Sequence, residues 1–323
     1  MNKYSKAEIL QKMEEEGVEF IRLQFTDMFG VLKNIAVPAS RLIKVLENNC
    51  TIDCASLDGF VNGEEEYLYL KPDLDTFAIL PWRPQNGKVA RFLCDICRED
   101  GSEYEISSRW ILKKSLERAA SMGYTFQVNP ECEFFLFHTD DNGLPTTLTH
   151  EKAGYLDTSP VDLGENTRRD IILTLEKMGY EIESSHHEIA SAQHEIDFSY
   201  EDALGTADKL MTFKMTVRTI AKRYGLHATF MPKPRQEING SGMHLNMCLL
   251  KDHKNVFTEE DGELSRTGEA FIAGIFQHIA GMTAILNPLV NSYKRLVPGF
   301  EAPSDVTWSR TQRNPLIRVC KKR

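Results

Sequence analysis

The most informative stretch for the fold is TFQVNPECEFFLF, residues 125–137. Its composition is typical of a β-strand, and Glu131 and Glu133 stand two residues apart within it. Side chains two apart on a strand point to the same face, so both carboxylates face the same way. A solvated strand face fits poorly, because an apolar run follows directly. Two like charges so close repel, and a bound cation removes that cost, so the stretch predicts a metal-binding strand.

A pattern of helix, glycine and strand recurs three times around this stretch. Each unit begins with an amphipathic helix that ends at a glycine, the usual residue after a last helical turn. The predicted helices are residues 108–122, 165–178 and 206–224, and the strands that follow are 125–128, from 181 onward, and 227–230. Alternating helices and strands predict a layered α/β arrangement. A further apolar helix is predicted at residues 267–286.

The N-terminal part reads as a separate, smaller domain. Ser5 and Glu8 fit a capping box that opens a helix ending near Gly17. Alternating runs then predict the strands of a small mixed sheet at residues 20–25, 76–80 and 89–93. A polar stretch at residues 98–103 is a natural boundary. We therefore expect two domains, residues 1–103 and 104–323.

Composition narrows the class of protein. The 323 residues carry a formal net charge of −9, which argues against a nucleic-acid partner. We find neither an apolar run long enough to span a bilayer nor a signal-peptide core, and expect a cytoplasmic protein without a membrane partner. The seven cysteines are odd in number and widely spread, so disulfides are not expected. A zinc site at Cys94 and Cys97 is the weaker alternative to small buried strand residues.

A second carboxylate pair lies in HHEIASAQHEIDF, residues 186–198. Glu188 and Glu195 are symmetric about Ser191-Ala192. If that dipeptide is a hairpin tip, the two glutamates lie directly opposite each other, with Cβ atoms about 5 Å apart. The pair would again require a cation. Oxygen-rich ligand sets of this kind suit magnesium or manganese.

Two further segments have both a functional and a structural interpretation. The turn NGSG, residues 239–242, lets backbone approach a ligand, and His244 just after it is either a metal ligand or a satisfied core histidine. A basic segment at residues 291–318 offers arginines for carboxylate or phosphate, or is an exposed positive surface. Together with divalent metals, these features suit phosphoryl transfer to a carboxylate.

Taken together, the motifs closely resemble bacterial type I glutamine synthetase, almost from end to end. The matching blocks are PECEFF (130–135), HHE (186–188), QHEIDF (193–198), ATFMPKP (228–234), NGSGMH (239–244) and NSYKRLVPG (291–299). The resemblance implies an α+β chain, with an N-terminal β-grasp domain followed by a catalytic α/β barrel-like domain. It implies ATP-dependent ligation of ammonia to the γ-carboxylate of glutamate through γ-glutamyl phosphate. Mg²⁺ or Mn²⁺ would be the metal, and double rings would share active sites between subunits.

The resemblance also assigns roles to single residues. One metal would be held by Glu133, Glu188 and Glu195, and the other by Glu131 and His244. Residues assigned to glutamate are Asn239, Gly240 and Arg295. Residues assigned to ATP are Glu183, Asn246 to Cys248, Arg313 and Arg318. Glu301 would be the acid of a flap over the intermediate, Asp53 would take a proton from ammonium across a subunit boundary, and Tyr155 would lie near the ammonium pocket.

Some positions depart from the family pattern. The family's Asp-Gly-Ser-Ser block is Asp53-Cys54-Ala55-Ser56, a serine near ATP is Cys248, and the Pro-Gly between the paired glutamates is Ser191-Ala192. The family also continues beyond Arg318 with a strand carrying a further metal ligand, so the barrel and the second metal site are expected to be incomplete. An amine-using γ-glutamyl ligase and a non-catalytic subunit of a ring are the alternative readings.

Overall fold

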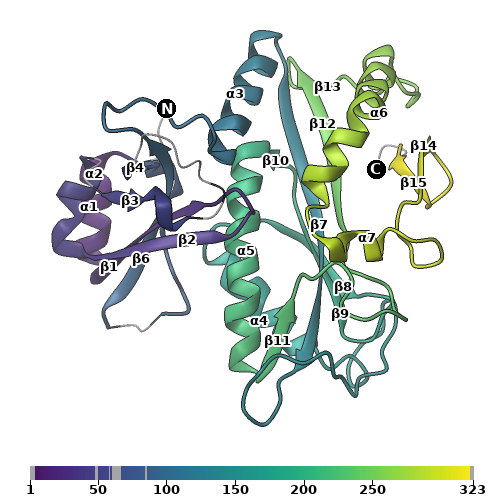
Figure 1. The fold of residues 1–323 in the computed structure, drawn as a ribbon, viewed down its shortest axis with the longest axis horizontal. Coiled ribbons are helices and arrows are strands. Elements are labelled where there is room, and N and C mark those ends of the chain that lie inside the picture. Colours follow the sequence, from purple (N-terminus) through teal and green to yellow (C-terminus); the bar gives the residue numbers. More distant parts are fainter. Residues whose placement is uncertain (1–3, 48–49, 58, 60–66, 84–85, 321–323) are drawn as a thin grey trace. The chain divides into compact units, whose positions relative to one another are not determined.

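A computed structural model describes residues 4–47, 50–57, 59, 67–83 and 86–320 (Figure 1). The ends of the two predicted domains, residues 1–3 and 321–323, lie outside this part. The chain forms two compact units, Met1–Arg118 and Ala119–Arg323, which are described separately below. Their division falls within helix α3 (Ser108–Ser121). The domain boundary expected after residue 103 stays a prediction.

The first unit opens with helix α1 (Lys6–Glu15), whose start the sequence predicted correctly. The Ser5 hydroxyl accepts the backbone N–H of Glu8, and the Glu8 carboxylate accepts the backbone N–H of Ser5. The capping box is therefore confirmed. The helix ends before Gly17, which has a φ of 65° that side chains other than glycine rarely adopt.

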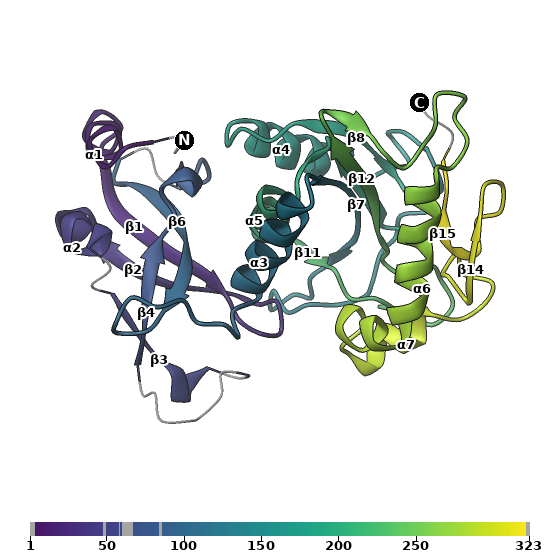
Figure 2. The same ribbon diagram turned by 90° about the horizontal axis from the view of Figure 1, so that it is seen from above.

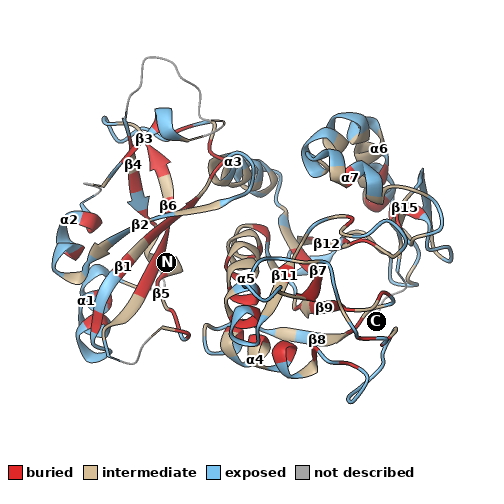
Figure 3. Cartoon of the chain, turned by 60° about the horizontal axis from the view of Figure 1, so that its bottom comes forward, coloured by how far each residue is buried: buried red, intermediate tan, exposed pale blue. Residues whose placement is uncertain are grey.

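A mixed sheet forms the centre of the first unit. Its strand order is β2 (Leu32–Pro38), β1 (Val18–Thr26), β6 (Lys88–Cys97), β4 (Tyr67–Pro72) and β3 (Thr51–Asp53), with β5 (Ala78–Ile79) beside β6. Strands β1 and β6 are parallel, and the other pairs are antiparallel. Apolar side chains of the sheet, of α1 and of α2 (Leu42–Leu46) form its core, visible as red segments in Figure 3.

The strand expected at residues 76–80 is only partly confirmed. Leu74–Thr76 is a single 3-10 turn, and β5 is limited to two residues. The Asp73 carboxylate accepts the backbone N–H of Asp75 at 3.2 Å, and the Thr76 hydroxyl donates to the Asp73 carbonyl at 2.7 Å. Such local side-chain bonds offer the backbone an alternative to strand pairing.

The start of α3 is tied to the first unit by ion pairs. Arg109 donates to Asp73 at 2.6 Å and to Asp95 at 2.5 Å, and Lys113 donates to Asp95 at 2.5 Å. These side chains are mostly buried, so the bonds fix where the helix begins.

The second unit is organised around one long strand, β7 (Thr125–His138) (Figures 1 and 2). One edge of β7 pairs with β12 (Met243–Lys251) and then with β11 (Leu226–Thr229). The other edge pairs with β10 (Glu201–Asp202) and then with β9 (Gln193–Phe198), beyond which lies β8 (Ile182–His187). A short strand, β13 (Lys254–Asn255), extends the sheet beside β12. The strand predicted at residues 125–128 is thus the first part of a much longer one.

Aromatic packing joins this sheet to helix α5 (Ala203–Arg223), which lies against α4 (Glu165–Glu176). Phe213 of α5 is fully buried, and its ring centroid lies 6.1 Å from that of Phe134 on β7 and 5.1 Å from that of Phe198 on β9. Phe134 alternates with Glu133 along β7, so the face with the glutamates is opposite the face packed on α5.

Helix α6 (Arg266–Leu286) overturns one expectation. It is long and apolar enough to cross a membrane, with a mean hydropathy of 1.4 in a window that is 6% buried. Glycine, threonine and histidine interrupt its apolar residues, but only Arg266 and Glu269 are charged. The expectation that no apolar run could span a bilayer is therefore wrong. One such helix is weak support for a membrane protein, because helices in soluble proteins satisfy the same criteria.

The last described elements follow α6. They are helix α7 (Val290–Arg295) and a parallel pair of strands, β14 (Asp305–Ser309) and β15 (Pro315–Arg318). The two strands were not predicted from the sequence.

Replacing Phe213 with alanine should lower the free energy of unfolding of the second unit by about 3–5 kcal/mol, because it leaves a cavity among buried rings. The matched control is Ile285→Ala, since Ile285 is 79% exposed and its loss should cost about 0.5 kcal/mol or less. Urea unfolding followed by circular dichroism measures both. Equal losses in the two variants would contradict this account of the core.

Candidate metal centre and substrate site

The predicted metal ligands lie in two rows across one face of the second sheet. In the first row, β-pairing places His244 opposite Glu131, and Glu131 opposite Asp197. In the second row, Glu133 is opposite Glu195, which is opposite His186. Directly opposed residues share a face, and successive rows are two residues apart. The same-face placement of the two β7 glutamates is thus confirmed.

The predicted hairpin register is wrong, although its tip is where the sequence placed it. Glu195 is opposite His186, not Glu188. Gln193 donates its backbone N–H to the Ala190 carbonyl at 2.9 Å, and its own carbonyl accepts the backbone N–H of Glu188 at 2.8 Å. Because Gln193 bonds on both sides of Ile189, the residues before the tip loop out of the ladder and shift the register.

Glu188 nevertheless reaches the cluster. One ligand atom each from His186, Glu188 and Glu195 lie within 4.8 Å of one another. His186 donates Nε2–H to Glu188 at 2.9 Å, and the backbone N–H of Ile189 donates to the other carboxylate oxygen at 3.0 Å. These bonds hold Glu188 beside the row that contains Glu195.

The electrostatics of the cluster favour a cation. Burial raises the pKa of Glu133 to about 7. Burial, with a hydrogen bond to Asp197 and the charge of that residue, raises the pKa of Glu195 to about 10. Burial also acts against ionisation of Glu188, but the hydrogen bonds from His186 and the Ile189 backbone, with the charge of His186, together outweigh it and lower the pKa. Without a counterion, Glu133 and Glu195 favour bound protons that a metal ion would displace.

The glycine turn at residues 239–242 lies against this cluster. Gly242 donates its backbone N–H to Glu133 at 2.8 Å, and the Gln193 amide bridges Glu133 at 2.7 Å and the Gly240 carbonyl at 3.1 Å. A Cβ on Gly242 would lie 2.8 Å from both Glu133 and the Arg295 guanidinium, so a larger residue would displace these two side-chain ends. Gly240 likewise has Arg295 within 3.1 Å of its absent Cβ. The turn therefore joins the metal ligands to the residues that are expected to bind the substrate glutamate.

Arg295 is a buried cation at this point. Burial lowers its pKa, while the nearby Glu133 charge opposes that shift. Its Nε has no hydrogen-bond partner within the described residues, although it is buried. An orphaned guanidinium N–H beside glycine backbone offers a place for a carboxylate.

The first row continues toward the segment expected near ATP. Asn246 donates to Glu131 at 2.8 Å, and Asn129 donates to Glu183 at 2.8 Å. Alternation along β12 puts Asn246 and Cys248 on the face of His244. Burial raises the pKa of the Cys248 thiol, which therefore stays neutral and fits an unreactive role beside a ligand.

His244 faces Arg318 as well as Glu131. The Arg318 guanidinium lies 3.4 Å from His244 Nδ1. Burial, followed by the Arg318 charge, lowers the pKa of His244, so the ring is neutral. Because a guanidinium can only donate, the lone pair of the ring lies on Nδ1 and faces Arg318, which a metal bound at that nitrogen would displace.

The expected flap acid is close to the glycine turn. Glu301 is 3.5 Å from the Asn239 amide and 3.7 Å from the Arg313 guanidinium. It has a φ of 52° in the left-handed region, which is strained for a glutamate. The structure thus brings Asn239 and Arg313 close to Glu301. Both distances are long for hydrogen bonds, and the Arg313 and Glu301 side chains are largely exposed.

The two residues expected at the ammonium pocket lie in different units. Tyr155 is in the second unit, with its ring centroid 5.5 Å from that of His186, and is 53% exposed. Asp53 is in the first unit, exposed, and accepts from the Ala55 backbone and the Ser56 hydroxyl, each at 2.9 Å. Tyr155 therefore approaches the metal centre, while the role of Asp53 stays a prediction.

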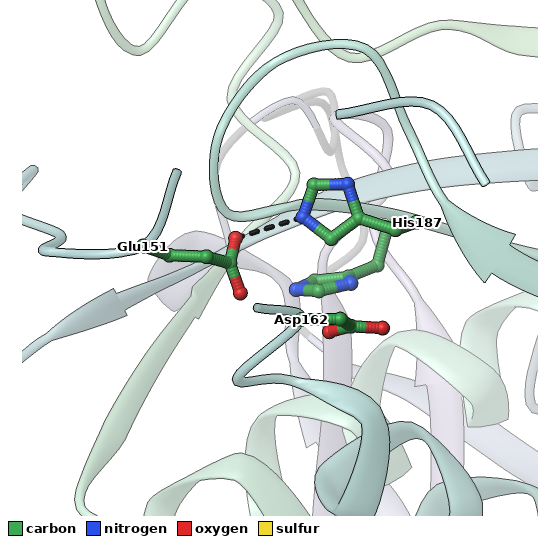
Figure 4. A group of neighbouring side chains, drawn as sticks. Glu151, Asp162 and His187 are labelled. Atoms are coloured by element: carbon green, nitrogen blue, oxygen red, sulfur yellow. Dashed lines mark hydrogen bonds and ion pairs between the residues drawn. The ribbon is translucent and has the colours of Figure 1, made fainter. Parts of the chain in front are cut away.

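Sequence reasoning missed His186 and Asp197. Both could have been found by extending the two-residue alternation from Glu188 and Glu195 along their strands. It also missed a buried polar cluster behind the turn between β8 and β9, of which Figure 4 shows Glu151, Asp162 and His187. That cluster has no periodic signal, because Glu151 and Asp162 come from irregular segments.

Metal binding should become tighter as pH rises from about 6 to about 8. Glu133 and Glu195 have raised pKa values and must lose protons to bind a cation, so each displaced proton costs up to about tenfold in affinity per pH unit below its pKa. Calorimetric Mn²⁺ titrations in buffers of different ionisation enthalpy measure the protons released. Glu133→Gln should release fewer protons, and a pH-independent affinity would contradict the assignment.

Comparison with known proteins shows the family of the chain. Residues 17–99 match the family profile of the glutamine synthetase beta-Grasp domain, and residues 105–323 match that of the glutamine synthetase catalytic domain. A glutamine synthetase from Clostridium saccharobutylicum is 57% identical over 99% of this chain and 72% of its own length. One from Staphylococcus epidermidis is 51% identical over 98% of this chain and 72% of its own length.

Solved structures show the same fold. Plasmodium falciparum glutamine synthetase superposes with a TM-score of 0.89 at 28% identity, covering 98% of this chain and 68% of its own. A protein named GmaS, in complex with ADP, superposes with a TM-score of 0.81 at 31% identity, covering 90% of this chain and 67% of its own. The expected α+β fold, with a β-grasp domain before a catalytic domain, is confirmed. The chain therefore belongs to the glutamine synthetase family and is a ligase of that family.

Proposed function

We propose that this chain ligates ammonia to the γ-carboxylate of glutamate at the expense of ATP. The observation that carries the proposal is the pair of ligand rows on one sheet face, joined through Gly242 to Arg295. Carboxylates for divalent ions lie on one side of this junction, and a buried guanidinium lies on the other. This is the combination that phosphoryl transfer to a carboxylate requires.

The residues fit a divalent metal by their chemistry. Glu133, Glu188 and Glu195 would hold one ion, and Glu131 and His244 would hold another. The raised pKa values of Glu133 and Glu195 mean that, without a cation, these two carboxylates favour bound protons which a metal ion would displace. Oxygen donors with a single imidazole suit Mg²⁺ or Mn²⁺. When bound, such ions supply neutralisation of charge on the phosphate oxygens.

The remaining residues position substrate. Arg295 and the Asn239-Gly240 backbone would bind glutamate, with the γ-carboxylate directed toward the metal ligands. Glu183, the Asn246 to Cys248 segment and the two arginines of the C-terminal segment, Arg313 and Arg318, would lie around ATP. The γ-phosphoryl group of ATP passes to the γ-carboxylate, which gives γ-glutamyl phosphate and ADP.

The second step needs a base and protection from water. Asp53 would take a proton from ammonium, and the resulting ammonia attacks the acyl carbon and displaces phosphate. Tyr155 would line the ammonium pocket beside His186. Glu301 would close over the acyl phosphate and keep water from hydrolysing it.

We further infer the organisation in which this chemistry takes place. The domain boundary after residue 103, a cytoplasmic location and double rings with shared active sites are proposals of the same kind. In such a ring, Asp53 would act across the subunit boundary, as the family resemblance implies.

The primary test is ADP release by the purified chain with glutamate, ATP, Mg²⁺ and ammonia, compared with a panel of primary amines. We expect turnover with ammonia and identify glutamine by mass. Turnover only with amines would show that the nucleophile is an organic amine and not ammonia. The departures at Cys54 and Ala55, where the family has Gly and Ser, would agree with that result. No turnover with any amine, despite Mn²⁺ binding, would favour a non-catalytic subunit.

Asp53→Asn should raise the KM for ammonia at least tenfold at neutral pH, because the amide cannot accept the proton. The defect should shrink as pH rises, since more of the ammonia is then already unprotonated. Asp100→Asn is the matched control, because Asp100 also accepts a backbone N–H in an exposed turn of the same unit. A defect that does not change with pH would contradict the role of a base.

A further inference from the structure

A buried polar cluster supports the turn between β8 and β9, on the side away from solvent. Its members are less than a tenth exposed and come from four segments: Glu151, Asp162, Arg168, His187 and His194. Figure 4 shows Glu151 directed at the His187 ring, with Asp162 close by. The proposed function gives these residues no contact with substrate or metal, so their arrangement requires its own explanation.

The cluster has the composition of a metal site, but its cations are already present. Arg168 donates to Asp162 at 2.7 Å and lies 2.8 Å from His194 Nδ1. Those two side chains therefore already bind a guanidinium. A divalent ion would have to displace a buried arginine, which leaves an uncompensated charge.

Glu151 is fully occupied by hydrogen-bond donors. One oxygen accepts His187 Nε2–H at 2.8 Å and the backbone N–H of Ala192 at 2.5 Å, and the other accepts the backbone N–H of Leu163 at 2.7 Å. His187 Nδ1 faces the Glu188 carbonyl at 2.6 Å. Because both ring nitrogens face acceptors, the ring donates on both sides and links Glu151 directly to the backbone of Glu188.

Ala192 is the strained point of the turn. Its φ is 67°, in the left-handed region that favours glycine. Its side chain is buried with Ala190 against Phe135 and Phe137 of β7. In this conformation the backbone N–H of Ala192 points inward and donates to Glu151. The carboxylate therefore stabilises a conformation that is strained for alanine and would not be strained for glycine.

We propose that Glu151 is a positioning residue for the metal centre: it holds the strained Ala192 turn and the Glu188 backbone so that Glu188 reaches His186 and Glu195. The bonds to Ala192 and to His187 act on either side of the Ile189 and Ala190 segment that loops out of the ladder. Gln193 also bonds to Ala190 and Glu188, but without Glu151 the left-handed conformation of Ala192, which comes directly before Gln193, loses the carboxylate that holds it. The inference rests on the proposed metal site, and on no other part of the proposed function.

The test measures Mn²⁺ binding by electron paramagnetic resonance, without turnover. Glu151→Gln removes the charge and one acceptor at nearly constant shape, and should weaken Mn²⁺ binding about 10- to 100-fold, the usual range for partners of metal ligands. Glu165→Gln is the matched control. Glu165 also accepts a loop backbone N–H, from Ser159 at 3.1 Å, but makes no bond to the turn, so its loss should leave Mn²⁺ binding unchanged.

Ala192→Gly separates positioning from general destabilisation. Glycine adopts the left-handed conformation without strain, so the turn should depend less on Glu151. We expect Glu151→Gln to weaken Mn²⁺ binding several-fold less in the Ala192→Gly chain than in the unmodified chain. The double-mutant cycle reports this coupling directly. Equal losses in both backgrounds, or no loss in either, would overturn the proposal.

Two further measurements keep the outcome decisive. If Glu151→Gln does not fold by circular dichroism, Glu151→Asp replaces it, because it keeps the charge but cannot reach all three donors. That variant should also bind Mn²⁺ more weakly, and unchanged binding would overturn the proposal. If the unmodified chain itself binds no Mn²⁺, the proposed metal site fails, which is a distinct result from a failure of Glu151 to support it.

Discussion

Repulsion between carboxylates on one face of a β-sheet is the constraint on which this structure depends. Glu131, Glu133, Glu195 and Asp197 occupy neighbouring positions on β7 and β9, and burial makes the charges of Glu133 and Glu195 costly. A sheet fixes these distances, because the backbone ladder leaves little freedom to separate the side chains. The sheet therefore holds the carboxylates at distances where their charges repel. Cations, protons or arginine side chains are the means of satisfying it.

The arrangement of the second unit follows from this constraint. The opposite face of β7 carries Phe134, which packs with Phe213 of α5 and stabilises the sheet by apolar burial. Successive residues of β7 thus alternate in role: Phe134 contributes to the apolar core, whereas Glu131 and Glu133 on the opposite face require a cation. Behind the β8–β9 turn, Arg168 and His187 supply positive charge inside the protein itself. On the face of the sheet that carries the ligand rows, Arg295 supplies positive charge beside Glu133, and a bound metal ion would supply more.

Sequence periodicity predicted the parts of this structure that repeat. The start of α1, the helices before the central strands and the shared face of Glu131 and Glu133 follow from spacing alone. Periodicity could not give the register of β8 against β9, because it depends on where residues leave the ladder. Here that is decided by Gln193, which bonds to both Ala190 and Glu188. The same limit concealed Glu151, since its partners are set by tertiary packing and not by its position in a pattern.

The pairing of β7 along both edges has a consequence for how such a protein can change over time. Strands β12 and β11 pair with one edge of β7, and β10 and β9 pair with the other. The position of each row of ligands is therefore set by the backbone of β7. Insertions in loops distant from the β8–β9 turn and the turn at residues 239–242 leave that spacing unchanged. A single inserted or deleted residue within β7 would turn the remaining carboxylates into the aromatic core. Length variation should therefore be tolerated in loops that carry no site residue and excluded from β7, which sets the spacing of the ligands.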